Sequence, residues 1–265
     1  MSIKRSRRKK FARKPWYVRA FEKDYLSRYA HRSDAAAAAE IHFLVPWLNL
    51  PRGARILDLC CGAGRHSRAL AASGYNVIGI DLSAALLREA RSHGARKNMR
   101  HGTIRYVRAD MRKLPLAARS VDGGICMFTS FGYFASDREN ARVLKEAARV
   151  LKPGSPFVLD YLNLKYTLKN LEPESQRRVG KVEMHEKRSF DRRTRRINKS
   201  IQACENGKCE MMCESLRAYS PQELKRLFKR AGFKVQSVFG DLAGAAFNAN
   251  SSPRCVVLAR KAART

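Results

Sequence analysis

Apolar positions are most regular in the first third of the chain, where they predict a strand, a helix and a second strand. Residues 55–59 form a short apolar run that leads into Gly62, as buried parallel strands do. In residues 65–73 the apolar side chains fall on one helical face. Residues 77–80 are again apolar and end at Asp81. This order predicts a parallel βαβ unit.

The glycines and the acid of this unit indicate what it binds. Gly62 and Gly64 let the backbone come close to a ligand at the start of a helix. Asp81, at the tip of the second strand, can accept hydrogen bonds from both hydroxyls of a ribose. We therefore expect a ligand that contains adenosine, either a dinucleotide or S-adenosylmethionine.

The third position of the glycine motif separates these two ligands. A dinucleotide site needs a small residue there to leave room for the pyrophosphate. This chain has Ser67, preceded by the bulky Arg65 and His66, and Arg65 is suited to meet the carboxylate of S-adenosylmethionine. The sequence favours S-adenosylmethionine and keeps a dehydrogenase as a minor alternative.

At this point the chain resembles the class I S-adenosylmethionine-dependent methyltransferases. The first motif of that family is an acid followed by glycines at alternate positions, matched here by Asp58, Gly62 and Gly64. Cys60 stands where the family most often has its first glycine. The resemblance implies that the cofactor, S-adenosyl-L-methionine, is bound around this turn by Asp58, Cys60, Gly62, Gly64, Arg65, Asp81 and Leu82.

Three motifs further along extend the resemblance. Asp110 matches the acid that reads the adenine amino group in the family, and Met111 follows it. Residues 121–128 look like the fourth strand, whose end at Met127 faces the methyl donor, and residues 151–160 resemble the turn and strand that come next. The resemblance implies an α/β fold: a Rossmann-like, doubly wound sheet of seven mostly parallel strands with an antiparallel last strand.

Helices outside the βαβ unit are marked by their first residues. Ser33 can cap an alanine-rich helix over residues 35–45, which should stop before Pro46. Ser220 and Glu223 form a capping box for a helix near the end of the chain. We expect both helices to serve as scaffold.

Residues 1–34 indicate a basic arm followed by a lid helix. Residues 1–14 are rich in Lys and Arg and contain no acid. Phe21, Tyr25 and Tyr29 lie four apart and therefore on one face of a helix. In similar methyltransferases such a helix folds over the cofactor, so Tyr25 and Tyr29 are lid candidates. An aromatic stripe packed on the core and a platform for stacking RNA bases are the alternatives.

An insert at residues 178–217 divides the predicted methyltransferase core into residues 35–177 and 218–265. Asn206 and Gly207 between alternating runs are a strong signal for a β-hairpin turn. With the turn there, charged residues meet opposite charges and apolar residues meet apolar ones across the two strands. We expect a three-stranded antiparallel flap that covers the substrate. The predicted cross-strand pairs include Lys199 with Glu214 and Ile201 with Met212.

The seven cysteines are an odd number, and no secretory apolar segment precedes them, so we expect a cytoplasmic protein. The hairpin register sets Cys204 opposite Cys209, with Cys213 further along the same face. His185 is the nearest fourth ligand for zinc, but the cysteine spacing does not suit a zinc site. We expect no metal, and neighbouring thiols that can form a disulfide.

The charge balance is unusual, because 54 Lys and Arg face 23 Asp and Glu, a net charge of +31. Such a field attracts polyanions without specifying which one. Three explanations remain open: contact with RNA or a ribosome, for which residues 1–14 are a plausible contact, an acidic membrane surface, and a merely solvated surface. No apolar run approaches the ~18 residues needed to cross a bilayer.

Methyl transfer depends on alignment of the reactants more than on one type of catalytic side chain. The candidates for positioning the acceptor are Asp160 and Tyr161, at the end of the fifth strand, and the histidines His31 and His185. Residues 129–133 lack the proline-held amide or acid that grips a base nitrogen. We therefore expect methyl transfer to an O or N atom of a small molecule. The alternatives are an RNA or ribosome-associated methyltransferase and a catalytically silent RNA partner that binds the cofactor.

Overall fold

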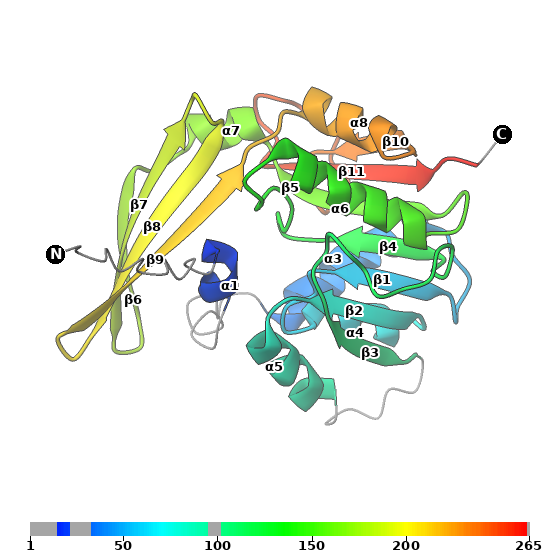
Figure 1. Cartoon of the computed structure of the whole chain (residues 1–265), viewed down its shortest axis with the longest axis horizontal. Coiled ribbons are helices and arrows are strands. Elements are labelled where there is room, and N and C mark those ends of the chain that lie inside the picture. Colours follow the sequence, from blue (N-terminus) through cyan, green and yellow to red (C-terminus); the bar gives the residue numbers. More distant parts are fainter. Residues whose placement is uncertain (1–14, 22–32, 95–101, 264–265) are drawn as a thin grey trace, which may run out of the picture.

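The protein contains two β-sheets of different size, and helices surround the larger one (Figure 1). The computed structural model describes residues 15–21, 33–94 and 102–263. The strands of the larger sheet are β1 (Arg55–Leu59), β2 (Asn76–Asp81), β3 (Ile104–Arg108), β4 (Gly123–Cys126), β5 (Pro156–Leu162), β10 (Phe233–Phe239) and β11 (Arg254–Lys261). Those of the smaller sheet are β6 (Glu174–Val179), β7 (Val182–Asp191), β8 (Arg196–Glu205) and β9 (Lys208–Arg217).

The larger sheet has the strand order β10-β11-β5-β4-β1-β2-β3. Its first five strands along the chain pair in parallel, and β11 runs antiparallel to both of its neighbours. The order of strands reverses between β1 and β4, and ligands of doubly wound proteins bind at the carboxyl ends of strands at such a point. The predicted seven-stranded, mostly parallel sheet with an antiparallel last strand is confirmed.

Helices cover both faces of this sheet. The helices in the described ranges are α1 (Trp16–Ala20), α3 (Asp34–Leu48), α4 (Arg65–Ala72), α5 (Ala84–Gly94), α6 (Asp137–Val150), α7 (Leu164–Lys169) and α8 (Pro221–Arg230), of which α1 contacts β9 of the smaller sheet. One hydrophobic core lies between the sheet and α3 and α4, and the other between the sheet and α6 and α8. Within the described ranges, no helix is both long and apolar enough to cross a membrane.

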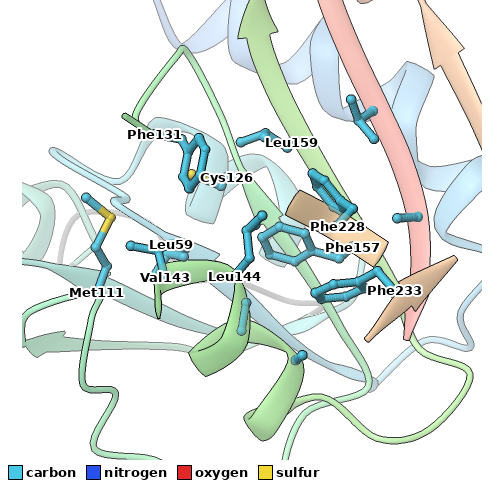
Figure 2. Packing of buried hydrophobic residues seen from close by; sticks show 14 of the residues in the cluster. Leu59, Met111, Cys126, Phe131, Val143, Leu144, Phe157, Leu159, Phe228 and Phe233 are labelled. Atoms are coloured by element: carbon cyan, nitrogen blue, oxygen red, sulfur yellow. The ribbon is translucent and has the colours of Figure 1, made fainter. Parts of the chain in front are cut away.

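The central strands contribute to both cores because successive side chains of a strand point to opposite faces. Ile56 of β1 lies in the core under α3, and its neighbour Leu57 lies in the core under α6. In the core under α6 and α8 the ring centroid of Phe157 is 6.2 Å from that of Phe228 and 5.5 Å from that of Phe233 (Figure 2). Burial of each such side chain contributes ~1.5–3 kcal/mol. This packing fixes the strands whose ends carry the site.

Helix α3 is longer than the sequence predicts. Ser33 caps it as expected, but the helix continues through Pro46 to Leu48, so the predicted stop before Pro46 is wrong. Proline removes a single backbone hydrogen bond, and here it does so in the last turn. Leu44 and Leu48, on either side of Pro46, are both buried and hold that turn against the sheet.

The smaller sheet has four antiparallel strands in the order β6-β7-β8-β9, not the three that the sequence predicts. The additional strand is β6, which begins at Glu174, ahead of the expected start of the insert. Val179 is its one aliphatic residue, and its side chains alternate between exposed and half-buried. A strand with no buried side chain leaves no hydrophobic pattern in the sequence.

The predicted register of β8 and β9 is confirmed. Lys199 lies opposite Glu214, and Cys204 lies opposite Cys209. Cys204 and Cys209 are joined by a disulfide, whereas Cys213 is an exposed free thiol. In the part of the chain that the structure describes, no group of His, Cys, Asp and Glu residues is arranged to hold a metal ion.

Candidate functional site

A cavity of about 560 Å³ lies at the carboxyl ends of the parallel strands. Residues that follow β1, β2, β3 and β4 form its inner half, and α1 and β9 contribute to its outer half. This volume is typical of sites for small ligands. The predicted site residues that line the cavity are Cys60, Gly62, Arg65, Asp81, Leu82, Asp110, Met111 and Met127.

The turn after β1 brings backbone to the cavity wall. Cys60, Gly62 and Gly64 have φ angles of 62°, 55° and 77°, all in the left-handed region. A Cβ atom at Gly62 would meet only Leu86, at 3.9 Å, so the Gly62 backbone borders open space. A Cβ atom at Gly64 would lie 2.2 Å from the Tyr106 hydroxyl, and Gly64 does not line the cavity. Gly62 is therefore open to a ligand, whereas Gly64 allows the turn to pack on β3.

Asp81 ties this turn to the end of β2. Its two carboxylate oxygens accept hydrogen bonds from the backbone N–H groups of Gly62, at 2.9 Å, and Ser83, at 2.8 Å. Burial raises the pKa of the Asp81 carboxyl, and the two N–H groups oppose this rise. Each carboxylate oxygen has a second lone pair. Asp81 can therefore also accept hydrogen bonds from hydroxyl groups of a ligand in the cavity.

Asp58 supports the turn from inside the protein. Its carboxylate is buried and accepts a hydrogen bond from the Ser67 hydroxyl at 2.5 Å. Burial raises the pKa of the Asp58 carboxyl. Asp58 does not line the cavity, so the ligand contact implied by the family resemblance stays a prediction. Its contact with Ser67 instead joins the end of β1 to the first turn of α4.

Asp110 is oriented by Arg112. The Arg112 guanidinium donates hydrogen bonds to the Asp110 carboxylate at 2.6 Å and 3.1 Å, and it also pairs with Glu139. Its Cζ atom lies 4.1 Å from the ring centroid of Phe134. Burial raises the pKa of Asp110, but the hydrogen bonds from Arg112 outweigh burial and the pKa is lowered. An ionised carboxylate is thus held at the cavity beside Met111.

Arg65 lies on the wall at the start of α4. Its guanidinium Cζ is 5.2 Å from the ring centroid of Phe128, and its Nη1 is 3.8 Å from the Glu40 carboxylate. Glu40 is also hydrogen-bonded to His66 at 2.5 Å. These contacts fix the predicted carboxylate-binding arginine next to the glycine turn.

The outer half of the cavity contains aromatic residues that the sequence analysis did not assign to a site. The ring centroids of Trp16 and Tyr133 are 5.1 Å apart, and those of Tyr17 and Phe134 are 5.3 Å apart. Phe21 lies 5.6 Å from Tyr133 by the same measure. We call these five rings, from α1, the residue after it and the loop after β4, the aromatic chamber. Strand β9 adds Glu214, Ser215 and Leu216 to its wall.

One arginine joins two walls of the aromatic chamber. Arg196, the first residue of β8, donates hydrogen bonds to the carbonyl oxygens of Tyr133 at 3.2 Å, Phe134 at 3.0 Å and Ser215 at 2.7 Å. All three acceptors line the cavity, and Arg196 does not. The loop after β4 and strand β9 are therefore held together by a residue outside the cavity.

Asp160 and Tyr161 lie outside the cavity. Asp160 is buried, pairs with Arg254 at 2.5 Å and accepts a hydrogen bond from the Phe128 N–H at 2.8 Å. Tyr161 is buried, and its hydroxyl donates to the Arg217 carbonyl. The expected role of these two residues in positioning the acceptor stays a prediction, and their observed contacts are structural. They fix the loop after β4 and the end of β9.

His185 lies on β7, is exposed, and does not line the cavity. Its neighbours Met184 and Glu186 are buried, so alternation along the strand turns His185 to the opposite face, and its expected role stays a prediction. Tyr25, Tyr29 and His31 lie outside the described residues. Of the predicted lid, the structure describes the single turn of α1 and Phe21.

A family model described as a methyltransferase domain matches residues 56–154, from β1 to just beyond α6. Residues 56–154 thus belong to a methyltransferase domain. The matched part includes the glycine turn, Asp81 and Asp110. The resemblance seen in the sequence is thus confirmed.

Solved structures share the fold of this chain over almost its whole length. The CcbJ methyltransferase from Streptomyces caelestis has a TM-score of 0.77 at 21% identity and covers 94% of this chain and 99% of its own. An S-adenosylmethionine-dependent methyltransferase from Clostridium acetobutylicum ATCC 824 has a TM-score of 0.75 at 19% identity. The match covers 91% of this chain and 96% of that protein. At these identities the likeness shows the fold alone.

Curated relatives match part of the chain. A dTDP-3-amino-3,6-dideoxy-alpha-D-glucopyranose N,N-dimethyltransferase from Streptomyces fradiae is 36% identical over 133 residues, which are 50% of this chain and 45% of that protein. The chain spans 34% to 64% of the length of the curated relatives that it matches. The Streptomyces fradiae enzyme is named for a small molecule, and the comparison gives no support to the RNA alternative.

Proposed function

We propose that this methyltransferase transfers a methyl group from S-adenosyl-L-methionine to an N or O atom of a small molecule held in the aromatic chamber. The observation that carries the proposal is the shape of the cavity, about 560 Å³ in volume, which joins a polar inner half to an aromatic outer half. A walled chamber of this kind suits a compact acceptor. The smaller sheet then acts as the substrate flap, because β9 forms part of the chamber wall.

The inner half fits the cofactor. The open backbone at Gly62 permits close approach, and Asp81 and Asp110 offer carboxylates to the ribose hydroxyls and the adenine amino group. Arg65 offers a guanidinium to the carboxylate of the amino acid moiety. When bound, S-adenosyl-L-methionine supplies a methyl group on a positively charged sulfur. The residues of this chain would orient the two reactants and exclude water, which is most of what such a displacement requires.

Calorimetric titration with S-adenosyl-L-methionine tests the inner half. We expect the wild type to bind and Asp81→Asn to bind at least about tenfold more weakly, because a charged acceptor is lost. Asp122→Asn is the matched control, since Asp122 lies just before β4 and outside the cavity. Equal affinity of the wild type and Asp81→Asn would show that the cofactor is not held as proposed.

Labelled S-adenosyl-L-methionine and fractionated cell extract test the acceptor. We expect the label to enter the small-molecule fraction. Label in RNA would instead support the alternative that rests on the net charge and on residues 1–14. Cofactor binding without transfer to any fraction would indicate a catalytically silent protein.

We also infer a cytoplasmic location. Five cysteines are free thiols, Cys60 and Cys61 at the cavity among them, and a reducing compartment keeps thiols in this state. The same compartment would favour reduction of the Cys204–Cys209 disulfide.

A further inference from the structure

The cavity is acidic although the chain as a whole is strongly basic. Lys and Arg outnumber Asp and Glu by 54 to 23 in the sequence. Among the described residues that line the cavity the balance is reversed, because the carboxylates outnumber the guanidinium groups Arg65 and Arg68. These carboxylates are Asp34, Asp81, Glu89, Asp110 and Glu214. The excess of negatively charged side chains among these lining residues favours cationic ligands.

Four of these carboxylates belong to the inner half or its edge. Asp81 and Asp110 follow β2 and β3. Asp34 pairs with Arg68 at 2.5 Å, and Glu89 contacts the half-buried His93 at 2.8 Å. The inner half therefore accounts for all of the acidic lining except Glu214.

Glu214 brings a carboxylate to the aromatic chamber. It lies on β9 two residues before Leu216, so both side chains are on the same face of the strand, and both line the cavity. Lys199 is its cross-strand partner, and the Lys199 ammonium lies 3.0 Å from the buried Glu186. Glu186 also pairs with Arg177, at 3.2 Å, and with a second arginine, Arg188. Arg177, Arg188 and Lys199 thus all contact Glu186, which lies on β7.

The rings of the chamber add a second feature that suits a cation. Trp16, Tyr17 and Phe21 lie beside Tyr133 and Phe134, and all five line the same cavity as Glu214. Aromatic faces attract ammonium groups, tryptophan most strongly. A carboxylate among aromatic rings is a recurrent way to bind an alkylated ammonium group, because the rings match its apolar surface and the carboxylate matches its charge.

We propose that the chamber recognises a small-molecule amine in its ammonium form, with Glu214 as the charge-recognising residue. This inference rests on the proposed function and narrows the acceptor from an N or O atom to an amine nitrogen. An alkylamine is protonated at neutral pH and would bind as its ammonium ion, which has no lone pair. Before transfer it would lose one proton, to the Glu214 carboxylate or to water, and the nitrogen lone pair would then form the bond to the methyl group as the bond from sulfur to that group breaks. The bound ammonium form and the methylated product are both cations and are attracted by Glu214, whereas a neutral alcohol can only donate a hydrogen bond to this carboxylate.

Tryptophan fluorescence offers a direct binding test that does not depend on turnover. The chain has two tryptophans, Trp16 in the chamber and Trp47, which is 40% exposed and does not line the cavity. In a Trp47→Phe background the signal reports on Trp16. We would titrate this protein with choline, which cannot accept a further methyl group on nitrogen, and with its neutral carbon isostere 3,3-dimethylbutan-1-ol.

We expect choline to bind at least about fivefold more tightly than the neutral isostere, a ratio typical of cation–aromatic recognition. Glu214→Gln should reduce this ratio to below about twofold. Glu210→Gln is the matched control, because Glu210 lies on the same face of β9, is exposed, and does not line the cavity. This control should keep the full preference for choline.

Three outcomes would overturn the inference: no binding of choline, equal binding of the two probes, or a preference that Glu214→Gln leaves intact. The comparison of the two probes needs no change at Glu214, so it stands even if that variant does not fold. Calorimetry with S-adenosyl-L-methionine distinguishes failure of this inference from failure of the proposed function, because only the proposed function requires that this compound binds. Cofactor binding together with label transfer to a hydroxyl compound would retain the methyltransferase and exclude the amine.

Discussion

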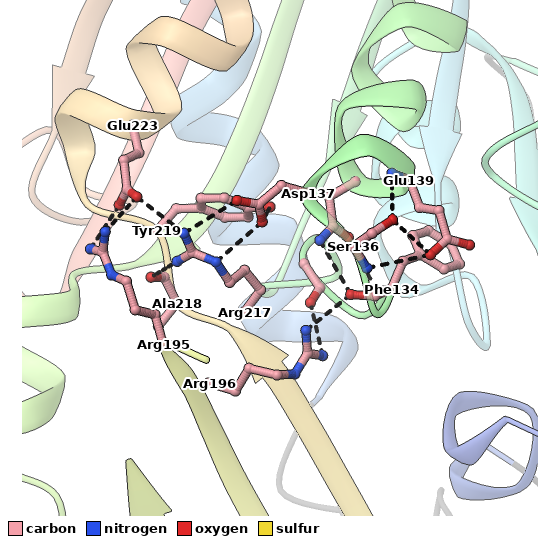
Figure 3. Close-up of polar contacts among 12 residues, drawn as sticks. Phe134, Ser136, Asp137, Glu139, Arg195, Arg196, Arg217, Ala218, Tyr219 and Glu223 are labelled. Atoms are coloured by element: carbon pink, nitrogen blue, oxygen red, sulfur yellow. Dashed lines mark hydrogen bonds and ion pairs between the residues drawn. The ribbon is translucent and has the colours of Figure 1, made fainter. Parts of the chain in front are cut away.

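Arg196 donates a hydrogen bond to the carbonyl oxygen of Phe134 over 3.0 Å, which joins the first residue of β8 to the loop after β4 (Figure 3). The same guanidinium donates from Nε to the Ser215 hydroxyl at 2.7 Å. The carbonyl groups of an irregular loop are not hydrogen-bonded to a neighbouring strand. The planar guanidinium group of arginine has five N–H donors and can therefore hold several such carbonyl groups in one arrangement. Arg196 is therefore a positioning residue, which affects a ligand only through the walls of the chamber.

Arg196→Lys should weaken acceptor binding and spare the cofactor. Lysine keeps the charge, but its single ammonium group cannot bridge the carbonyls of Tyr133, Phe134 and Ser215. We expect KM for the acceptor found by the labelling assay to rise about tenfold, which corresponds to about 1.4 kcal/mol. The dissociation constant of S-adenosyl-L-methionine, measured by calorimetry, should stay within about twofold of the wild type.

Arg195→Lys is the control for this variant. Arg195 is the neighbouring residue but pairs with Glu223, at 2.6 Å, and does not contact the chamber wall (Figure 3). Its replacement should leave KM for the acceptor unchanged. Equal effects of the two variants would mean that Arg196 contributes general stability and not the position of the walls.

At position 60 we expect a glycine variant to be more stable than an alanine variant, which is the reverse of the order found in helices. Cys60 has a left-handed backbone, and its Sγ lies 3.4 Å from the Met111 Sδ. Glycine and alanine both lose the sulfur contact, but alanine keeps a Cβ atom in a conformation that costs about 1–2 kcal/mol. We therefore expect Cys60→Gly to be more stable than Cys60→Ala by about 1 kcal/mol in urea unfolding.

A helical position provides the comparison for Cys60. Ser92 lies within α5 and is exposed. There the order should be the normal one, with Ser92→Ala more stable than Ser92→Gly by about 1 kcal/mol. The prediction for Cys60 is wrong if both positions show the same order.

Acid should remove the stabilisation that Glu223 provides. Burial raises the pKa of Glu223, but hydrogen bonds from the Ser220 N–H and from Arg217 outweigh it, and the pKa lies below its ordinary value of 4.5. A carboxyl whose pKa is lower in the folded protein stabilises it above the unfolded pKa, and this contribution is lost as the pH falls through the folded pKa. Glu223→Gln keeps the helix cap but removes the charge.

The measurement is the free energy of unfolding in urea between about pH 7 and about pH 3. Wild type should be more stable than Glu223→Gln at the neutral end, and the two curves should converge below pH 4.5. The exposed Glu210→Gln serves as the control and should run parallel to the wild type throughout. The prediction is wrong if the difference in free energy of unfolding between wild type and Glu223→Gln is the same at about pH 3 as at about pH 7.

Reduction of the Cys204–Cys209 disulfide should affect the tip of the β8–β9 hairpin and not the cavity. Neither cysteine lines the cavity, and the register is also supported by pairs such as Lys199 with Glu214. The closed loop is short, so loss of the bond costs at most about 2 kcal/mol of hairpin stability. We expect dithiothreitol to speed proteolysis near the turn and to leave affinity for S-adenosyl-L-methionine unchanged.

A double variant checks that the disulfide is responsible. Cys204→Ser combined with Cys209→Ser should be cleaved at the rate of the reduced wild type, and dithiothreitol should not change that rate. A change in cofactor affinity on reduction of the wild type would contradict the separation of hairpin tip and cavity.

The features that the sequence predicts correctly have local causes. The β1–α4–β2 unit follows from apolar runs that meet glycines, and the β8–β9 register follows from the Asn206–Gly207 turn. Asp81 and Asp110 could be placed at the cavity because the carboxyl ends of parallel strands meet at one edge of a sheet. Asp160 also lies towards the carboxyl end of a parallel strand, but its side chain pairs with Arg254 and does not line the cavity.

The aromatic chamber could not be assembled from the sequence. Trp16, Tyr133 and Glu214 come from three segments that are far apart in the chain, and only the tertiary fold brings them together. The aromatic residues near the start of the chain were the one available signal, since tryptophan and tyrosine cluster around ligands. Nothing in the composition of β9 distinguishes Glu214 from the exposed Glu210.

The position of β11 between β5 and β10 has a consequence for synthesis on the ribosome. Both of its partners are made before it, so the nascent chain carries two open strand edges until β11 emerges. The gap is in the interior of the sheet, next to the strand that anchors the loop after β4. A ribosome that stalls before residue 254 would therefore hold a chain prone to pair with other chains, and a chaperone that covers such edges would matter most at that stage.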